Sequence, residues 1–206
     1  MSSIFSTAYL PSLVYFKKLI NEEKIQIEAF EHFQKQTIRN RCFILSANGI
    51  QCLTVPIHQP SGTKQLIKDV EIKDDISWQR LHWRALTASY NRSPFFEFYK
   101  EEFAVFFLIK KYKWLIEFNV DLLLWLLKNM KKPIPIETTS AFYPSMQNDF
   151  RAMSNARTPF TETGENFRKY NQVFSYKFGF VKNLSTIDLL FNIGNHSLTF
   201  ISEPLH

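Results

Sequence analysis

The chain has 206 residues, 45% of them hydrophobic and 16% aromatic, so it can bury a sizeable core and is not a disordered tail. Its net charge of +6 is a modest excess that does not indicate a dedicated nucleic-acid-binding protein. The two cysteines, Cys42 and Cys52, cannot make a disulfide scaffold and match no zinc-binding spacing, which favours a reducing, cytoplasmic compartment.

The chain shows no targeting or membrane-spanning pattern. Residues 1–10 have neither a cationic start nor a long apolar run, so we expect no signal peptide. The most apolar later stretch, residues 120–127, contains Asp121 and is much shorter than the roughly 20 residues that a membrane helix needs. We therefore expect no transmembrane segment.

The first elements have the pattern of an α/β protein. Residues 4–9 predict a strand, Pro11 ends it, and Ser12 is placed to cap a helix over residues 13–20. Residues 24–28 alternate between polar and apolar side chains as a second strand does. Strand, helix and strand in this order form the minimal unit of an α/β fold.

A β-hairpin is predicted next. Residues 41–46 and 50–55 flank Asn48-Gly49, a pair in which both residues tolerate the positive φ of a type I′ turn. Pro56 ends the second arm. Residues 58–68 have the composition of a mobile loop, and residues 70–72 could add another strand.

From Ser77 on, the apolar residues recur with the period of a helix. We expect one helix from Ser77 to a point before Pro94, a second over residues 95–107 and a third over residues 115–130. Pro133 and Pro135 close this helical middle segment.

The rest of the chain predicts a long polar insertion before a C-terminal helix. Residues 138–170 are polar and turn-rich, as in a lid, and residues 173–180 fit a last strand or turn. Ser185 is placed to cap a helix that runs to residue 193 and stops at Gly194. We expect one α/β domain over residues 1–206.

Residues 35–42 form the most distinctive stretch, with three cations, two carboxamides, a hydroxyl and a thiol beside a predicted strand. A dry, unpaired donor costs about 1–3 kcal/mol, so such a cluster is typical of a site for an anionic or oxygen-rich ligand. The alternative is a solvated loop with scattered charges. No Gly-rich phosphate loop occurs in the chain, so a bound nucleotide would need side chains such as Lys35 and Arg41 on its phosphates.

Short motifs in a consistent order run along nearly the whole chain and together resemble the WbqC-like family. They are Tyr9-Leu10-Pro11, Tyr15-Phe16, residues 35–41, Leu53-Thr54-Val55-Pro56, Ser77-Trp78, His82, Tyr90-Asn91, Pro94-Phe95-Phe96, Tyr170, Gln172-Val173-Phe174, Gly179-Phe180, Asn183-Leu184-Ser185 and Asp188-Leu189-Leu190. The family is associated with surface-polysaccharide and O-antigen (lipopolysaccharide) gene clusters. The resemblance implies a bacterial-type transferase acting on an activated or nucleotide-linked sugar.

The chain departs from the family pattern at two places. Many relatives carry Gln-Pro near the N-terminus and Asp-Asp after the second strand, where this chain has Ser6-Thr7 and Ala29-Phe30. If the acidic pair binds a metal or acts as a base, that function is lost here or has moved to Glu28 or Glu31. A spacing of three residues puts Glu28 and Glu31 on opposite faces of a regular strand, so we expect no metal site.

Two residues are candidates for the chemistry. His82 can act as a general acid or base, a role that the family resemblance favours, or it can be a half-buried histidine bonded to a backbone carbonyl. Cys42 can be a nucleophile activated by neighbouring arginines, or a buried inert thiol at the start of a strand.

The leading hypothesis is a cytoplasmic transferase-like enzyme of surface-glycan assembly, with His82 as the acid–base residue. The residues expected to bind its anionic substrate are Tyr9, Lys35, Arg39, Asn40, Arg41 and Asn91. The alternative is a non-catalytic module that binds a nucleotide sugar or a glycan intermediate. RNA binding is a third hypothesis, disfavoured because no aromatic and basic RNA-binding signature is present. The sequence names no cofactor.

Overall fold

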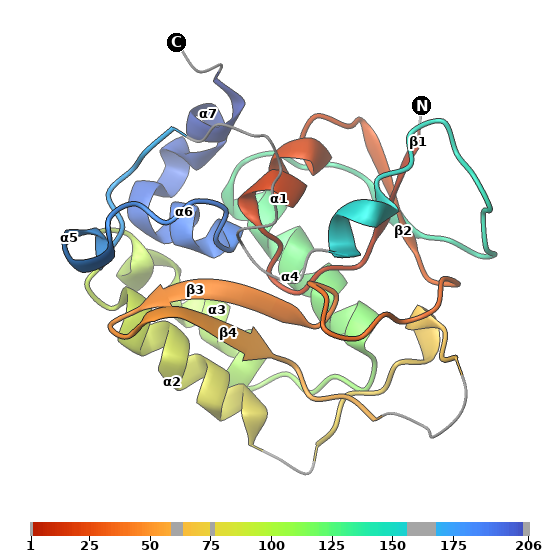
Figure 1. Cartoon of the computed structure of the whole chain (residues 1–206), viewed down its shortest axis with the longest axis horizontal. Coiled ribbons are helices and arrows are strands. Elements are labelled where there is room, and N and C mark those ends of the chain that lie inside the picture. Colours follow the sequence, from red (N-terminus) through yellow and green to blue (C-terminus); the bar gives the residue numbers. More distant parts are fainter. Residues whose placement is uncertain (1, 59–63, 75–76, 156–167, 204–206) are drawn as a thin grey trace.

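The computed structural model describes residues 2–58, 64–74, 77–155 and 168–203. It has the predicted α/β class, with a parallel sheet, an antiparallel hairpin and helices around both (Figure 1). Within the described residues, no helix is both long enough and apolar enough to cross a membrane.

The central sheet is parallel. β1 (Ser2–Ser6) pairs with β2 (Lys24–Glu28), and β2 pairs with β5 (Ile136–Thr138). The predicted strand–helix–strand opening is confirmed, with α1 (Leu13–Leu19) between β1 and β2. β1 ends at Ser6 rather than at residue 9, because the chain turns at Leu10, where φ is +42°. β5 was not predicted, since three residues after a proline carry no periodicity.

The predicted hairpin is confirmed, with β3 (Arg41–Ser46) antiparallel to β4 (Gly49–Thr54). The type I′ turn is wrong, because Gly49 has a φ of +100° while Asn48 does not have a positive φ. Ala47 and Asn48 form the loop between the paired residues Ser46 and Gly49. The Ser46 hydroxyl accepts a bond from the Asn48 N–H at 3.3 Å and donates to the Gly49 carbonyl at 2.9 Å, so a side chain holds this turn.

The three helices of the middle segment are α2 (Trp78–Tyr90), α3 (Phe96–Leu108) and α4 (Leu115–Asn129), close to the predicted bounds. α2 packs against β3 and α3, and Figure 1 shows it running beside the hairpin. Aromatic rings join α3 to the other helices: Phe103 lies 4.6 Å from Trp125 and 5.5 Å from Phe191 between ring centroids. The aromatic-rich composition thus builds the core.

The C-terminal part contains α5 (Ser175–Phe178), α6 (Thr186–Ile193) and α7 (Ser197–Ser202). α6 and its stop at Gly194, where φ is +66°, agree with the prediction. Of the strand or turn predicted for residues 173–180, the structure has the turn, with α5 as a single helical turn within it. Residues 70–72 make isolated bridges to Ile57 and Trp114 instead of a strand.

Part of the predicted insertion packs on the sheet. The Ile4 N–H donates to the Asn148 carbonyl at 2.9 Å, and the Phe150 N–H donates to the Ile4 carbonyl at 2.8 Å, so the chain lies along the outer edge of β1. A 3₁₀ helix, η2 (Arg151–Asn155), follows. Residues 156–167 of the predicted insertion, and residues 59–63 of the predicted loop, lie outside the described residues. The end of that loop is ordered as a 3₁₀ helix, η1 (Ile67–Asp69), whose Ile67 is fully buried.

Candidate functional site

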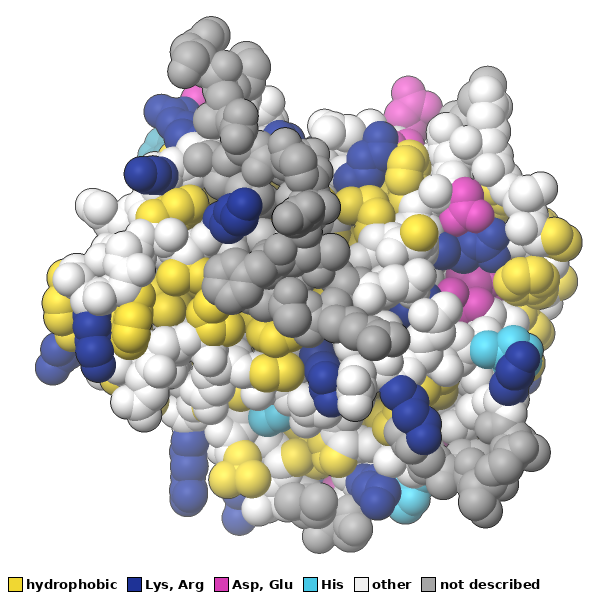
Figure 2. Space-filling view, in the orientation of Figure 1, with side chains coloured by type: hydrophobic (Ala, Val, Ile, Leu, Met, Phe, Trp, Pro, Cys, Tyr) yellow, Lys and Arg dark blue, Asp and Glu magenta, His cyan; other side chains and the backbone are white. Residues whose placement is uncertain are grey.

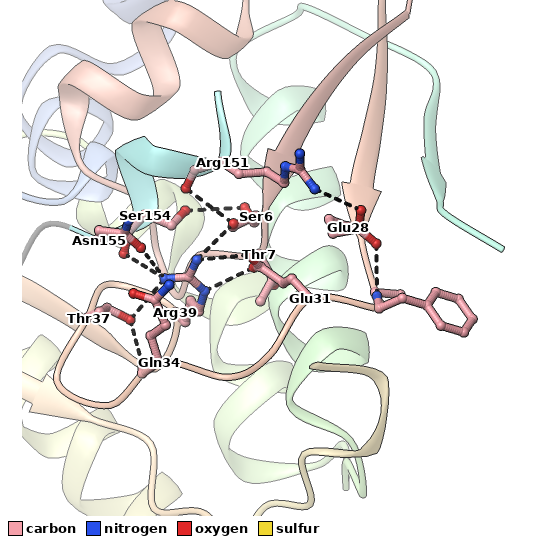
Figure 3. Close-up of polar contacts among 12 residues, drawn as sticks. Ser6, Thr7, Glu28, Glu31, Gln34, Thr37, Arg39, Arg151, Ser154 and Asn155 are labelled. Carbon is pink, nitrogen blue, oxygen red and sulfur yellow. Dashed lines mark hydrogen bonds and ion pairs between the residues drawn. The ribbon is translucent and has the colours of Figure 1, made fainter. Parts of the chain in front are cut away.

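The carboxyl ends of β1 and β2 bring together several buried polar groups, among them Ser6, Glu28 and Arg39. Ser6 and Glu28, the last residues of the two strands, are paired in register. Ligands of open α/β sheets commonly bind outside this edge, where loops of different strands converge. Here the loop after β2 and η2 meet beyond the strand ends (Figure 3).

A buried ion pair forms the centre of this region. Arg39 donates from Nε to Glu31 Oε1 and from Nη2 to Glu31 Oε2, both at 3.0 Å, with only 1% of its side chain exposed. The remaining guanidinium donors reach Ser6 Oγ at 3.0 Å and Asn155 Oδ1 at 2.9 Å. A guanidinium can be buried at this depth because its charge is neutralised and its donors are bonded.

The backbone of Arg39 is held from the opposite side by α4. Asn119 Nδ2 donates to the Arg39 carbonyl at 2.8 Å and to Thr7 Oγ1 at 3.0 Å. Asn119 is 1% exposed. A polar residue on the buried side of α4 thereby fixes the loop that carries Arg39.

A second ion pair lies beside the first. Glu28, fully buried, accepts from Arg151 Nη1 at 3.2 Å, from Thr139 Oγ1 at 2.7 Å and from the Phe30 N–H at 2.9 Å. Arg151 also donates from Nε to Asp149 Oδ1 at 3.0 Å and holds the pKa of Asp149 below its usual range. Arg151 therefore joins the chain after β5 to the end of β2.

The Ser6 hydroxyl connects the two pairs. It accepts from Arg39 Nη2 and donates to the carbonyl of Arg151 at 3.2 Å. Both arginines are fixed by residues on other elements, so the region is preorganised without a ligand.

A cavity of about 790 Å³ opens over these pairs. Its wall includes both arginines, two carboxylates, an exposed lysine and two aromatic rings. The lining residues are Glu31, His32, Phe33, Gln34, Arg39, Lys64, Phe142, Asp149, Arg151, Ala152 and Asn155. Of the three cations in this lining, Arg39 and Arg151 are already paired with Glu31, Asp149 and the buried Glu28, so an anionic group on a ligand would pair with the third. Within the described residues Lys64 makes no ion pair, which leaves its ammonium available to that group.

Of the residues predicted to bind substrate, Arg39 alone lines this cavity. Asn40 is buried and donates from Nδ2 to the Val55 carbonyl at 3.0 Å, so it fastens the base of the hairpin. Arg41 begins β3 opposite Thr54. Lys35 and Asn91 are exposed, the latter at the end of α2.

Tyr9 and His82 lie together in the core and not in the cavity. The Tyr9 hydroxyl is 2.8 Å from His82 Nδ1, and Tyr9 stacks on both His82 and Phe118. Burial lowers the pKa of His82 from 6.5 to about 4, and a hydrogen bond with the Thr54 backbone opposes that change. The ring is neutral near pH 7, and it is buried against Tyr9 and Trp78 outside the cavity lining.

Cys42 does not have the surroundings of a nucleophile. The side chain is 2% exposed within the core, and burial raises the pKa of its thiol well above the usual value. The thiolate that nucleophilic attack requires is therefore disfavoured. Both cysteines are free.

Glu28 and Glu31 are the carboxylates that the sequence offers as replacements for the Asp-Asp pair of many relatives. They are held by different arginines, Arg151 and Arg39. Within the described residues, no group of three or more His, Cys, Asp or Glu side chains is arranged to hold a metal ion.

Sequence reasoning missed Asp149, Arg151 and Asn155. They come from the predicted polar insertion, where the Asp-x-Arg spacing at 149–151 is the only local signal that two charges could pair. The contact between Arg151 and Glu28 joins residues 123 positions apart, which no local pattern indicates.

The fold and site together define an α/β domain with a polar ligand cavity at the carboxyl ends of its parallel strands. The WbqC-like protein family matches residues 7–158, more than half of the chain, and this chain belongs to that family. The match includes Glu28, Glu31, Arg39 and Arg151.

A relative among known proteins is the uncharacterized protein Rv1507c of Mycobacterium tuberculosis. The two are 30% identical over 94 residues, which are 46% of this chain and 40% of the relative. The match thus spans less than half of either protein. No solved structure matches this chain.

Proposed function

We propose that this protein is a transferase-like enzyme of surface-polysaccharide or O-antigen assembly that binds an anionic activated sugar. The observation that carries the proposal is the preorganised cavity over the Arg39–Glu31 and Arg151–Glu28 pairs. Membership of the WbqC-like family supports it through the gene clusters with which that family is associated.

The chemistry of the cavity suits a sugar that carries an anionic group. Carboxylates such as Glu31 and Asp149 accept hydrogen bonds from hydroxyl groups, and guanidinium and amide groups donate them. Phe33 and Phe142 supply apolar faces for the carbon side of a sugar ring. Lys64 supplies a cation for a phosphate or carboxylate.

The cavity volume is compatible with a ligand of this kind. Small-molecule sites usually enclose about 300–1,000 Å³, and this cavity falls within that range. The free thiols of Cys42 and Cys52 support the reducing, cytoplasmic location in which we place the protein.

A non-catalytic binding module is the second candidate, and one observation favours it. Both carboxylates that line the cavity, Glu31 and Asp149, are held in ion pairs with arginines, which suits them to positioning more than to proton transfer. In the described lining, His32 carries an exposed imidazole, and the enzyme hypothesis depends on it or on the substrate itself.

A thermal-shift screen with nucleotide sugars, free nucleotides, acyl-CoAs and divalent metals tests the binding claim. A ligand present at 100 times its dissociation constant stabilises by about 2.7 kcal/mol, which raises the melting temperature measurably. We expect one nucleotide-sugar class to give this shift and Lys64→Ala to weaken its binding about tenfold or more, the value of a charge-assisted hydrogen bond.

The matched control is Arg84→Ala, which removes an exposed cation on α2, a helix that does not line the cavity. It should bind as the wild type does. No shift with any nucleotide sugar, or equal losses in Lys64→Ala and Arg84→Ala, would contradict the proposed cavity. An assay of sugar consumption separates the enzyme from the binding module. The enzyme hypothesis expects the wild type to consume the bound sugar and His32→Gln to lose this activity.

A further inference from the structure

A separate surface at the tip of the hairpin combines exposed apolar side chains with unneutralised lysines. We define the α5 surface as Ile50 of β4 and, from α5 and the chain after it, Tyr176, Lys177, Phe178 and Lys182. Tyr176 is 81% exposed, and Phe178 and Ile50 are 38% and 36% exposed. Lys177 and Lys182 are exposed as well.

The α5 surface is a fixed platform rather than a loose tail. Leu45 of β3 packs with Phe174, Val181 and Leu184 in a small hydrophobic cluster of its own. The Ser185 N–H donates to the Phe43 carbonyl at 2.9 Å, which ties the chain after α5 to β3.

The contacts at the tip hold α5 against the hairpin turn. Lys177 Nζ donates to the Ala47 carbonyl at 2.9 Å and lies 5.0 Å from the centre of the Phe178 ring. The Phe178 ring also lies within 3.8 Å of the position that a Cβ on Gly49 would occupy. The Phe178 ring therefore packs on the hairpin turn while part of it remains exposed.

The segments that form the α5 surface carry no acidic side chain. The sequence has no Asp or Glu over residues 32–68, which contain the hairpin, or over residues 166–187, which contain α5. Figure 2 shows the same pattern at its left edge, where hydrophobic and basic side chains gather over α5 and the hairpin tip and no acidic side chain appears beside them. Among the described residues, neither Lys177 nor Lys182 forms an ion pair.

A second group of lysines, Lys110, Lys111 and Lys113, differs from the α5 surface because its members pair with carboxylates. Lys110 pairs with Asp121 at 2.8 Å, Lys111 with Asp74 at 3.6 Å, and Lys113 with Glu71 at 4.0 Å. The carboxylates offset its charge, so this cluster attracts an anionic partner less strongly than the α5 surface does.

We propose that the α5 surface docks this protein onto an anionic lipid bilayer. Aromatic side chains beside lysines suit the boundary between headgroups and acyl chains, where rings bury their apolar part and ammonium groups remain with the phosphates. Ile50 favours a lipid over a nucleic acid, because an aliphatic side chain has no stacking role with bases. The absence of carboxylates in these segments removes the repulsion that an anionic surface would otherwise meet.

Vesicle co-sedimentation of the full chain tests this proposal without reference to the sugar cavity. We expect binding to vesicles of phosphatidylcholine mixed with phosphatidylglycerol and little binding to phosphatidylcholine alone. Each lysine near an anionic membrane is worth about fivefold in partitioning, so K177A/K182A should bind about 25-fold more weakly. The wild type should keep part of its vesicle binding when salt is added, and Y176S/F178S should lose this salt-resistant part.

The matched control is K110A/K111A, which removes two lysines from the neutralised cluster and should partition as the wild type does. All of these side chains are exposed, so circular dichroism should report an unchanged fold. Equal partitioning of K177A/K182A and the control, or no phosphatidylglycerol dependence, would overturn the proposal. Tighter binding to single-stranded RNA through the same residues, or a dimer that Y176S/F178S dissociates, would assign the surface to another partner and also overturn it.

Discussion

Arg39 and Glu31 face each other through two parallel N–H···O bonds of 3.0 Å at the floor of the cavity. The pair is buried, and Ser6 and Asn155 bond the rest of the guanidinium. This geometry gives the cavity a rigid floor and also makes the fold depend on the pair.

Removing one partner leaves the other charge buried and alone. We expect Arg39→Gln to lower the free energy of unfolding by about 3–5 kcal/mol, the usual cost of breaking a buried ion pair. Urea denaturation measures this change. The control Lys100→Ala breaks the exposed Lys100–Glu97 pair and should cost less than about 1 kcal/mol.

The double variant R39Q/E31Q separates pairing from packing. With both charges removed, it should be more stable than the sum of the single losses indicates, since neither charge is stranded. Strictly additive losses would show that the two residues contribute independently and would contradict the paired arrangement.

His82 makes stability depend on pH. Its pKa is about 4 in the folded protein and 6.5 as a free side chain, so the unfolded state binds a proton first as the pH falls. Stability therefore decreases between about pH 6.5 and pH 4, by about 3 kcal/mol in total from this group.

The measurement is urea denaturation at several pH values for the wild type and His82→Gln. The variant should lose less stability over this window, because it has no group there to protonate. Identical pH profiles would contradict the buried, neutral state of His82. His82→Gln should also leave ligand binding at the cavity unchanged, since the ring does not line it.

Two glycines with similar backbone angles provide a test of local packing. Gly179 and Gly194 have φ of +69° and +66°, where an L side chain is strained by about 1–3 kcal/mol. A Cβ on Gly194 would lie 2.5 Å from the Phe95 ring, while a Cβ on Gly179 would meet nothing within 4 Å.

Gly194→Ala should therefore lower stability by about 1–3 kcal/mol more than Gly179→Ala, through overpacking against Phe95. Thermal denaturation of the two variants gives the difference directly. Equal melting temperatures would show that the end of α6 can shift to accept the methyl group.

The sequence predicted the elements that carry their own local signals. Asn48-Gly49 marked the hairpin, and Gly194 marked the end of α6. β5 escaped prediction because three residues after Pro135 have no period, and their strand state comes from pairing with β2.

The candidate site was predicted only in part for a similar reason. Of the cation-rich run, Arg39 lines the cavity, while the path of the chain leaves Lys35 exposed and takes Arg41 into a strand. Trp78, His82 and Leu86 are spaced four residues apart, a helical spacing that could have indicated the buried face on which the structure has His82. Arg151 reaches Glu28 from a distant segment, which requires the fold itself.

The most direct test of the cavity at the carboxyl ends of β1 and β2 is NMR titration of the isotope-labelled protein with the nucleotide sugar found in the screen. The account predicts that the backbone amide signals of His32, Gln34 and Asn155, which line the cavity, shift most. A second cavity of about 370 Å³ lies elsewhere, with Asn129 and Asn195 in its wall. Shifts concentrated at Asn129 and Asn195, with His32 and Gln34 unmoved, would contradict the account.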